Sequence, residues 1–326
     1  MPTLSRFLSP ARRLALVAMV GGTFAASSFA ATEPTAPSAP ASPAYSTPDT
    51  PSDKKRSTGW SFSDLADTLP QYLANRLPVF DRVGNVRFYV RPRLDSLFHS
   101  GYTRTPVGAK WQASKRFELF TEVQTYFAHG NDTASGAGLS GMNFGAKYEH
   151  FLPQFNNGGF SIGLNYRTPF NHSPISFTDG YRHLNPYIAA TRMIVPSWEL
   201  LGYGSFGAGL LEHTALPSNF GKNQLHSNTL AVLAGVAREW GRFNVSFTAR
   251  LASTEFVSDE GRQNLTLRPE VVIPLRRSPN AKTQIFITLG ARAIWGPDGF
   301  ESGTSTGVRV EFKVNRNKKY HFEPKV

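Results

Sequence analysis

The stretch Thr306-Gly-Val-Arg-Val-Glu-Phe-Lys-Val314 alternates strictly between apolar and charged side chains from Val308 onward. Successive side chains of an extended strand point to opposite faces, so the two kinds separate. One face carries Val308, Val310, Phe312 and Val314, and the other carries Arg309, Glu311 and Lys313. Such a strand can contact lipid with its apolar face and water with its charged face.

The same period-2 pattern recurs from about Asn85 to Val314. Most of the segments are close to the roughly 9–11 residues that a tilted strand needs to cross a bilayer. We predict twelve strands, at 85–98, 103–112, 116–128, 139–150, 158–168, 183–194, 198–211, 226–239, 242–254, 263–275, 283–295 and 304–314. The Gly-rich seventh strand, 198–211, has a two-sided pattern that assigns neither face.

The predicted connections alternate between short and long. Short ones lie near 113–115, 153–158, 196–197, 241 and 278–282, and longer polar ones near 99–101, 129–138, 171–182, 213–225, 254–262 and 296–303. Short turns at one end and long loops at the other are typical of transmembrane barrels. The sequence therefore predicts an all-β, antiparallel up-and-down transmembrane barrel over residues 85–314, with about twelve strands and both termini on the periplasmic side.

Residues 1–30 have the pattern of a secretion signal. Arg6, Arg12 and Arg13 form a positively charged start, and a short apolar stretch follows. We expect cleavage after Ala30; an uncleaved N-terminal anchor is the alternative. No later run approaches the roughly 18 apolar residues of a transmembrane helix.

Residues 31–58 are rich in Pro, Ala, Ser and Thr, which predicts a disordered linker. In the next segment, 59–82, apolar residues recur roughly at helical spacing, with Pro70 favouring a kink or two short helical turns. We expect this short amphipathic segment to be either a periplasmic lead-in or a plug that closes the barrel mouth. Beyond the last strand, residues 315–326 form a basic tail, which we expect to be periplasmic.

The composition narrows the classes of function. The chain has no cysteine, which excludes disulfides and thiolate chemistry, and its formal net charge is +12. A basic balance favours nucleic acid, anionic lipid or anionic solutes as partners. An exported chain seldom meets nucleic acid, so we expect lipid phosphates or acidic solutes.

On these features the chain resembles a Gram-negative outer-membrane β-barrel protein, over the secretion signal and residues 85–314. The last strand is similar to the assembly signal of such proteins, with Ser305, Gly307, Val310 and Phe312 at its polar, glycine, apolar and aromatic positions. In the usual signal the aromatic residue ends the chain, whereas here the chain continues to Val326. The resemblance implies outer-membrane lipids as surroundings and the barrel-assembly machinery as a partner during insertion. Twelve strands with inward arginines also resemble small channels for acidic oligosaccharides; barrels associated with aromatic degradation are another possibility.

The predicted lumen faces carry more basic than acidic residues. The candidate solute-binding residues are Arg87, Arg91, Arg93, Lys110, Arg167, Arg250, Arg268, Arg292 and Arg309, with Lys313 also inward. The inward acids are Asp95, Glu118, Glu122, Glu149, Glu270 and Glu311. Charged rings set selectivity in pores, and arginine binds carboxylate or phosphate with two parallel hydrogen bonds. These residues predict a channel for small anionic solutes, or internal ion pairs that fill a narrow lumen.

Two other functions remain open. A lipid-modifying outer-membrane enzyme would need a His/Ser pair, and the nearby pairs are His226-Ser227 and His99-Ser100. Neighbours in a strand face opposite sides, so His226 and Ser227 cannot easily share a proton, and we assign no catalytic residue. A non-conducting structural or adhesion barrel would have a filled lumen. The histidines show no metal-ligand spacing, and we expect neither a metal nor a cofactor.

Overall fold

The computed structural model describes residues 69–78, 81, 83–95, 102–128, 136–152, 158–170, 178–195, 198, 200–241, 243–276 and 282–315. They all belong to one compact unit, Trp60–Val326. The predicted secretion signal and linker, residues 316–326 of the basic tail, and the His99-Ser100 pair lie outside the described residues.

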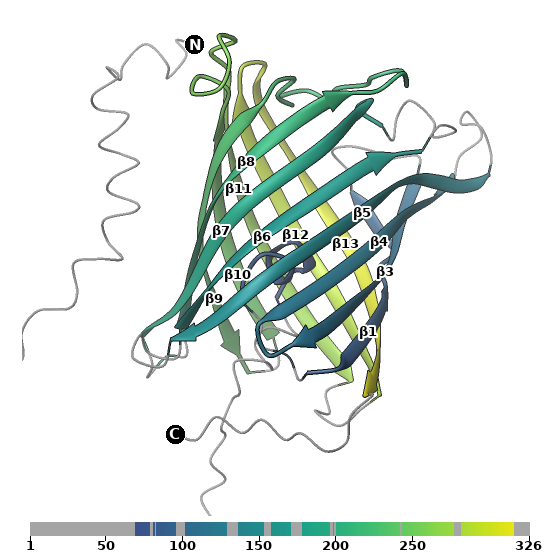
Figure 1. Cartoon of the computed structure of the whole chain (residues 1–326), viewed down its shortest axis with the longest axis vertical. Helices are drawn as coiled ribbons and strands as arrows, with labels where there is room; N and C mark the ends of the chain where they lie inside the picture. The colour runs from purple at the N-terminus through teal and green to yellow at the C-terminus, as the bar shows by residue number, and fades with distance from the viewer. Residues whose placement is uncertain are drawn as a thin grey trace, which may run out of the picture. The chain divides into compact units, whose positions relative to one another are not determined.

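The described chain is almost entirely strand (Figure 1). One four-residue helix, α3 (Gln71–Ala74), precedes the strands. The strands are β1 (Asn85–Val90), β2 (Arg93–Asp95), β3 (Tyr102–Ser114), β4 (Phe117–Ala128), β5 (Ala137–Leu152), β6 (Gly158–Pro169), β7 (Tyr181–Val195), β8 (Leu200–His213), β9 (Thr229–Trp240), β10 (Phe243–Ser253), β11 (Gln263–Arg276), β12 (Thr283–Gly296) and β13 (Gly299–Asn315). Among the described residues, no helix is long and apolar enough to cross a membrane.

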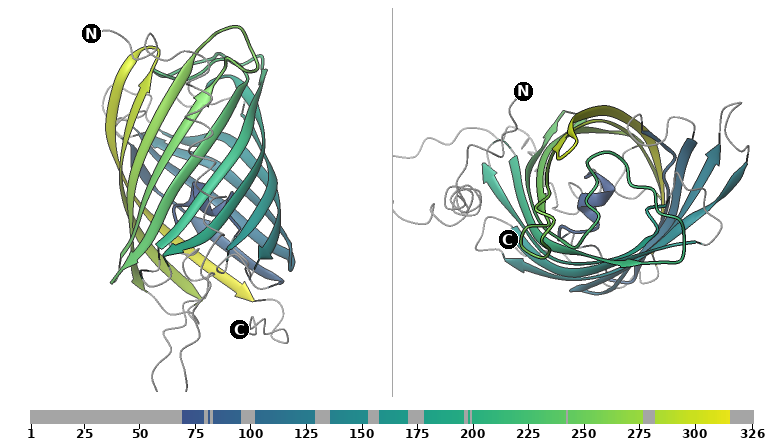
Figure 2. Two further views of the ribbon diagram at one scale, coloured as in Figure 1. Left: turned by 90° about the vertical axis from the view of Figure 1, so that its left-hand side faces the viewer. Right: turned by 90° about the horizontal axis from the view of Figure 1, so that it is seen from above.

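The sheet closes on itself. Each strand pairs antiparallel with its neighbours in chain order, and β1 pairs with both β3 and β13. β2 pairs with the same two strands, so β1 and β2 together occupy one strand position of the barrel, interrupted at Arg91-Pro92. We call each strand position a stave. Pro92 has no N–H to give to a ladder, but its carbonyl still accepts from Val308 N at 3.0 Å. The barrel therefore has twelve staves, as predicted, and Figure 2 shows it from the side and from above.

The barrel is apolar outside and polar inside. On β13 the side chains of Val308, Phe312 and Val314 are 39%, 45% and 51% exposed, whereas Arg309 and Glu311 are 4% and 5% exposed. Large apolar side chains are exposed in the same way around the rest of the wall. Soluble proteins rarely expose so much contiguous apolar surface. Within lipid, backbone N–H and C=O groups must be hydrogen-bonded to one another, and a closed barrel is one of the two structures that achieve this. The chain is a transmembrane β-barrel of the outer-membrane type.

Aromatic residues are exposed near both rims of this apolar surface. Trp198, Trp240 and Phe243 lie at the end with the short turns. Trp295 and Phe300 pair across the β12–β13 hairpin at the opposite end, with ring centroids 4.9 Å apart. Aromatic girdles at both lipid–water interfaces are a feature of transmembrane barrels.

Two sequence expectations change. The predicted long loop 296–303 is a tight hairpin with Pro297-Asp298 at its turn, and β13 starts at Gly299 rather than at residue 304. Gly299 adopts a positive φ of 97°, and the Trp295–Phe300 pair extends the ladder to the turn. The unassigned seventh strand, β8, also acquires faces, because Leu201 and Tyr203 are buried inside and Phe206 is exposed outside.

A charge on the lipid face should destabilise the barrel. Phe247 lies near the middle of β10 and is exposed on the outer face. Replacing it with Arg should cost about 2–4 kcal/mol of folding free energy, the range for Arg near the bilayer midplane. Urea unfolding in lipid vesicles measures the loss, and Phe247→Leu is the matched control. An Arg variant as stable as the Leu variant would contradict the assigned face.

Candidate functional site: the lumen and its plug

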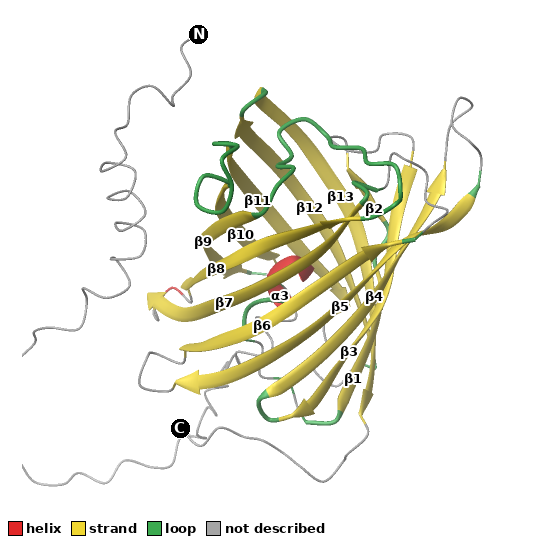
Figure 3. Ribbon diagram, turned by 45° about the horizontal axis from the view of Figure 1, so that its top comes forward, coloured by secondary structure: helices red, strands yellow, loops and turns green. Residues whose placement is uncertain are grey.

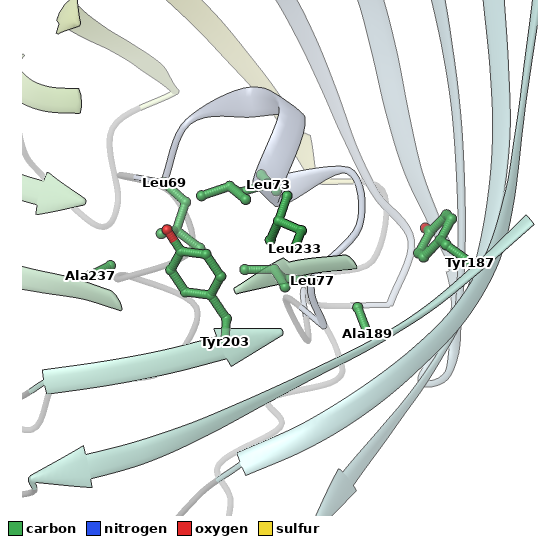
Figure 4. Close-up of a cluster of buried hydrophobic side chains, with 9 residues drawn as sticks. Leu69, Leu73, Leu77, Tyr187, Ala189, Tyr203, Leu233 and Ala237 are labelled. Carbon is green, nitrogen blue, oxygen red and sulfur yellow. The ribbon is translucent and has the colours of Figure 1, made fainter. Parts of the chain in front are cut away.

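The described part of segment 59–82 lies within the barrel. Figures 2 and 3 show α3 surrounded by the strands, and we call residues 69–78 the plug. Its side chains Leu69, Leu73, Ala74 and Leu77 are buried and form one cluster with the wall. The wall contributes Tyr187, Ala189, Tyr203, Leu233 and Ala237, which are shown with the leucines in Figure 4. This apolar patch lies on β7, β8 and β9, and the wall has further buried apolar side chains at Phe120, Val272, Phe286 and Ile294.

The wall also supplies hydrogen-bond donors to the plug backbone. The last carbonyls of a helix have no partner within the helix. Lys147 Nζ donates to the carbonyls of Ala74 and Leu77, at 3.2 and 2.9 Å. Tyr187 donates its hydroxyl to Asn75 O at 2.9 Å, and Ser161 donates to Arg76 O. Donors from β5, β6 and β7 therefore fix the C-terminal end of the plug.

Lys147 is also the centre of a buried ion-pair network. Its ammonium lies 2.7 Å from Glu149 and 3.2 Å from Glu118, and all three side chains are buried. Buried charges are tolerated when they are paired and hydrogen-bonded. The two carboxylates fix the ammonium where it reaches the plug, so the same lysine balances the wall and binds the plug.

The first turn and the middle of the plug contact the opposite wall. Arg309 donates to Leu69 O at 3.0 Å, pairs with Glu311 at 3.2 Å and stacks over the Phe286 ring at 4.3 Å. Arg268 lies 4.1 Å from the centroid of the Tyr72 ring. Two of the arginines predicted to meet a solute therefore contact the plug.

The arginine cluster predicted on the first strand is partly neutralised. Arg87 pairs with Asp81 and lies 3.9 Å from Glu311. Arg91 pairs with Glu122 at 2.6 Å. Arg93 lies opposite Arg104 in the β2–β3 register and within electrostatic range of Tyr72. Internal ion pairing thus accounts for Arg87 and Arg91.

Two further candidates lie at separate places. Lys110 is buried beside Arg87 on the neighbouring strand, with Glu118 and Glu311 in electrostatic range. Arg167 lies in the register opposite His183 and near Asp179, at the end with the long loops. Burial tends to raise the pKa of Asp179, but the hydrogen bond from His183 and the charges of His183 and Arg167 outweigh it, and the pKa lies below its ordinary value.

The remaining candidates converge. Arg250, Arg268 and Arg292 lie on the adjacent strands β10, β11 and β12, and we call them the wall arginines. Arg268 is opposite Thr248, one inward position from Arg250, and the flanking pairs Leu267↔Ala293 and Glu270↔Gly290 put Arg292 beside it. Glu270 pairs with Arg268 at 3.0 Å. The plug adds Arg76, which lies within electrostatic range of Arg250.

The loop between β8 and β9 is hydrogen-bonded to the β12–β13 hairpin through Asn223. This buried residue has a φ of 59°, its N–H donates to Asp298 Oδ2 at 3.0 Å, and its side-chain amide donates to Gly299 O at 3.2 Å. Asp298 N returns a hydrogen bond to Asn223 Oδ1 at 3.0 Å. At its other end the loop meets the start of β7, where Asn219 N donates to Thr178 O at 3.2 Å. The loop thus joins β7 to the β12–β13 hairpin, and Figure 2 shows it crossing the barrel seen from above.

The candidate enzyme pair does not assemble in the described structure. His226 and Ser227 precede β9 rather than lying within a strand. The His226 ring stacks on Phe220, with centroids 4.0 Å apart, while the Ser227 hydroxyl donates to Glu260. The two side chains take different partners, so no acid–base pair joins them.

Sequence reasoning missed several of these residues. Arg76 and Lys147 were not candidates, although the alternation that turns Glu149 inward also turns Lys147 inward. Their contacts gave no signal, because each joins residues far apart along the chain. Asn223 was missed for the same reason, since a lone asparagine in a polar loop is ordinary. Pro70 was the available signal for the plug, because it predicts a short helix.

No protein-family model matches the chain, and neither does any curated protein. Solved structures with a similar fold include a KdgM porin, 9% identical, covering 69% of this chain and 98% of that one, with a TM-score of 0.42. The COG4313 outer membrane channel from Pseudomonas putida F1 is 11% identical, covers 72% of this chain and 97% of that one, and has a TM-score of 0.48. The CymD monoaromatic hydrocarbon channel is 9% identical, covers 74% and 90%, and has a TM-score of 0.34. At this identity the likeness concerns the fold alone.

Removing the wall lysine that binds the plug should loosen the plug. Lys147→Met leaves Glu118 and Glu149 buried without their counter-ion and the carbonyls of Ala74 and Leu77 without a donor. Breaking a buried pair in this way costs about 3–5 kcal/mol. Thermal unfolding of the refolded protein should show the loss. Lys282→Met, at an exposed position at the turn end, is the matched control and should leave the unfolding temperature unchanged.

Releasing Asn223 should free the β8–β9 loop. Asn223→Ala removes both side-chain hydrogen bonds to the β12–β13 hairpin and retains a positive φ that alanine disfavours. Limited proteolysis in the loop should become at least about tenfold faster, equivalent to about 1.4 kcal/mol of local stability. Asn219→Ala, in the same loop, is the control. Equal cleavage rates for the two variants would show that the Asn223 contacts do not hold the loop.

Proposed function

We propose that the protein is an outer-membrane channel for small anionic solutes, with both termini on the periplasmic side. The observation that carries this proposal is the set of wall arginines, three inward cations on adjacent strands, of which Arg268 pairs with Glu270. A charged set of this kind in a confined lumen sets ion selectivity. Outer-membrane lipids surround the apolar wall, and the barrel-assembly machinery is the partner during insertion.

The polarity of the lumen supports a water-filled passage. The wall carries buried polar side chains on its inner face, among them Thr191, Ser205, Ser246 and Thr248. A polar inner face is the arrangement found in water-filled transmembrane barrels. A wall built for water suits the passage of solutes.

The width of the barrel and the plug limit what can pass. Eight strands are filled by side chains and sixteen leave an aqueous channel, so twelve staves leave a narrow lumen. The plug narrows it further. Small solutes such as acidic sugars or aromatic acids fit this limit better than large ones.

A second candidate is a non-conducting structural or adhesion barrel. The observation that favours it is the apolar cluster between the plug and the wall, because a plug packed on leucines and tyrosines can close the lumen. A folded barrel with no conductance, before and after the plug is loosened by Lys147→Met, would favour this second function.

Selectivity in a planar bilayer tests the channel. Arg250, Arg268 and Arg292→Gln together should shift the zero-current potential in a salt gradient towards cation preference. Loss of about 1 kcal/mol of electrostatic attraction changes the anion-to-cation permeability ratio about fivefold.

Exposed arginines outside the lumen provide the control. Arg116 and Arg182→Gln should leave the potential unchanged. A smaller shift is expected for Arg87 and Arg91→Gln, because this variant removes two lumen cations rather than three. Unaltered selectivity in the folded wall-arginine variant would remove the wall arginines from the proposal.

A further inference from the structure

The plug brings Arg76 towards Arg250 of the wall. Leu77, which follows Arg76, packs in the same cluster as Leu233, and Leu233 lies opposite Arg250 in the β9–β10 register. The two guanidinium groups lie within electrostatic range of each other, and both side chains are partly buried. Arg76 also lies over the Tyr187 ring, 5.5 Å from its centroid. Within the part of the chain that the structure describes, neither guanidinium has an ion pair or a side-chain hydrogen bond. This proximity of like charges contrasts with the complementary contacts of the rest of the plug.

The position of Arg76 is imposed by its neighbours. Hydrogen bonds from the wall fix the carbonyl of Asn75 before it, its own carbonyl and that of Leu77 after it. The backbone at Arg76 therefore cannot shift away from β10 without breaking those bonds. Two confined like charges raise the free energy of the plugged state unless an anion lies between them.

Among the described residues, neither cross-strand neighbour of Arg250 is an acid. Its cross-strand neighbours are Leu233 and Thr266, one apolar and one neutral. The carboxylates of Glu118 and Glu149 are held by Lys147. The anion that would fit must therefore come from outside the described protein.

The surrounding groups indicate what that anion is. Two guanidinium groups bind a carboxylate or a phosphate through short, charge-assisted hydrogen bonds. In the register, Ser205 lies opposite Leu233, which itself lies opposite Arg250. Among the described residues the buried Ser205 Oγ has no hydrogen-bond partner, and a polar group of the same ligand would supply one.

We propose that a small solute bearing a carboxylate or phosphate group binds between Arg76 and Arg250 and thereby stabilises the docked plug. Arg76 belongs to the plug, so the complete site exists only in the plugged state. A ligand that binds one state and not the other shifts the equilibrium towards the state it binds. The inference rests on the proposed function in taking the anion to be a solute that enters the lumen.

Accessibility of the plug provides the test. The chain has no cysteine, so Ala74→Cys gives one reporter thiol in the buried plug cluster. Its reaction with a maleimide reports plug release in the full chain, refolded in lipid-free micelles so that lipid phosphate is absent. Sodium phosphate and sodium succinate are the probes, compared with sodium chloride at equal ionic strength. At a probe concentration ten times its Kd, labelling should slow about elevenfold.

The effect must depend on both arginines. Arg76→Gln and Arg250→Gln, each in the Ala74→Cys background, should abolish the slowing by the probe, while Arg116→Gln, at an exposed turn, should retain it. As a second readout free of the reporter, the probes should raise the unfolding temperature of the natural chain but not of Arg250→Gln. Anion-independent labelling and anion-independent unfolding, together, would overturn the inference.

The experiments distinguish failure of this inference from failure of the proposed function. A barrel without anion selectivity in the bilayer that still shows arginine-dependent slowing by phosphate would retain the binding site and lose the channel. An anion-selective channel whose plug ignores both probes would retain the proposed function and lose this inference. Slowing that persists in both arginine variants would place the anion elsewhere and would also overturn it.

Discussion

Closure of the backbone ladder between the first and last strands is the constraint on which the rest of the molecule depends. β1 pairs with β13 from Asn85↔Asn315 to Val90↔Val310, and β2 continues the contact at Arg93↔Gly307. In a bilayer an open edge would leave rows of unpaired N–H and C=O groups. Each unpaired group would raise the free energy of the barrel by roughly several kcal/mol. Closure removes that cost and encloses a lumen, and only then does the alternation of side chains separate a lipid face from a polar one.

Within that lumen, several basic residues of the wall bind the plug. Two basic residues of the wall, Lys147 and Arg309, donate hydrogen bonds to backbone carbonyls at the two ends of the plug. Both also form ion pairs with glutamates of the wall. Carbonyls at a helix end carry partial negative charge, so cations near them are favourable. Arg250 and Arg76 depart from this pattern, and for that reason they, rather than the many paired arginines, point to a ligand.

The fold could be predicted from the sequence far better than the contacts of the site. Period-2 alternation and the spacing of turns depend on neighbours a few residues apart, so strand number, order and faces could be predicted for most of the wall. The β12–β13 hairpin was predicted as a loop because Glu301 to Gly303 is polar, while the Trp295–Phe300 pair that extends the ladder joins two strands. Inward direction could be predicted for the arginines, but partners could not, since Arg91–Glu122 and Arg309–Leu69 each join segments that the chain pattern does not relate.

The hydrogen bond from Arg309 to the carbonyl of Leu69 spans 240 positions of the chain. Its donor lies on the strand that closes the barrel, and its acceptor lies on the segment that precedes every strand. The plug's binding surface, which combines β5 to β9 with β13, is therefore complete only after the last strand has paired with the first. Contacts this distant in sequence form late in folding, because the intervening chain must be ordered first. The part of the barrel unit that is synthesised first thus takes its place last, and the order of synthesis is the reverse of the order of assembly at this contact.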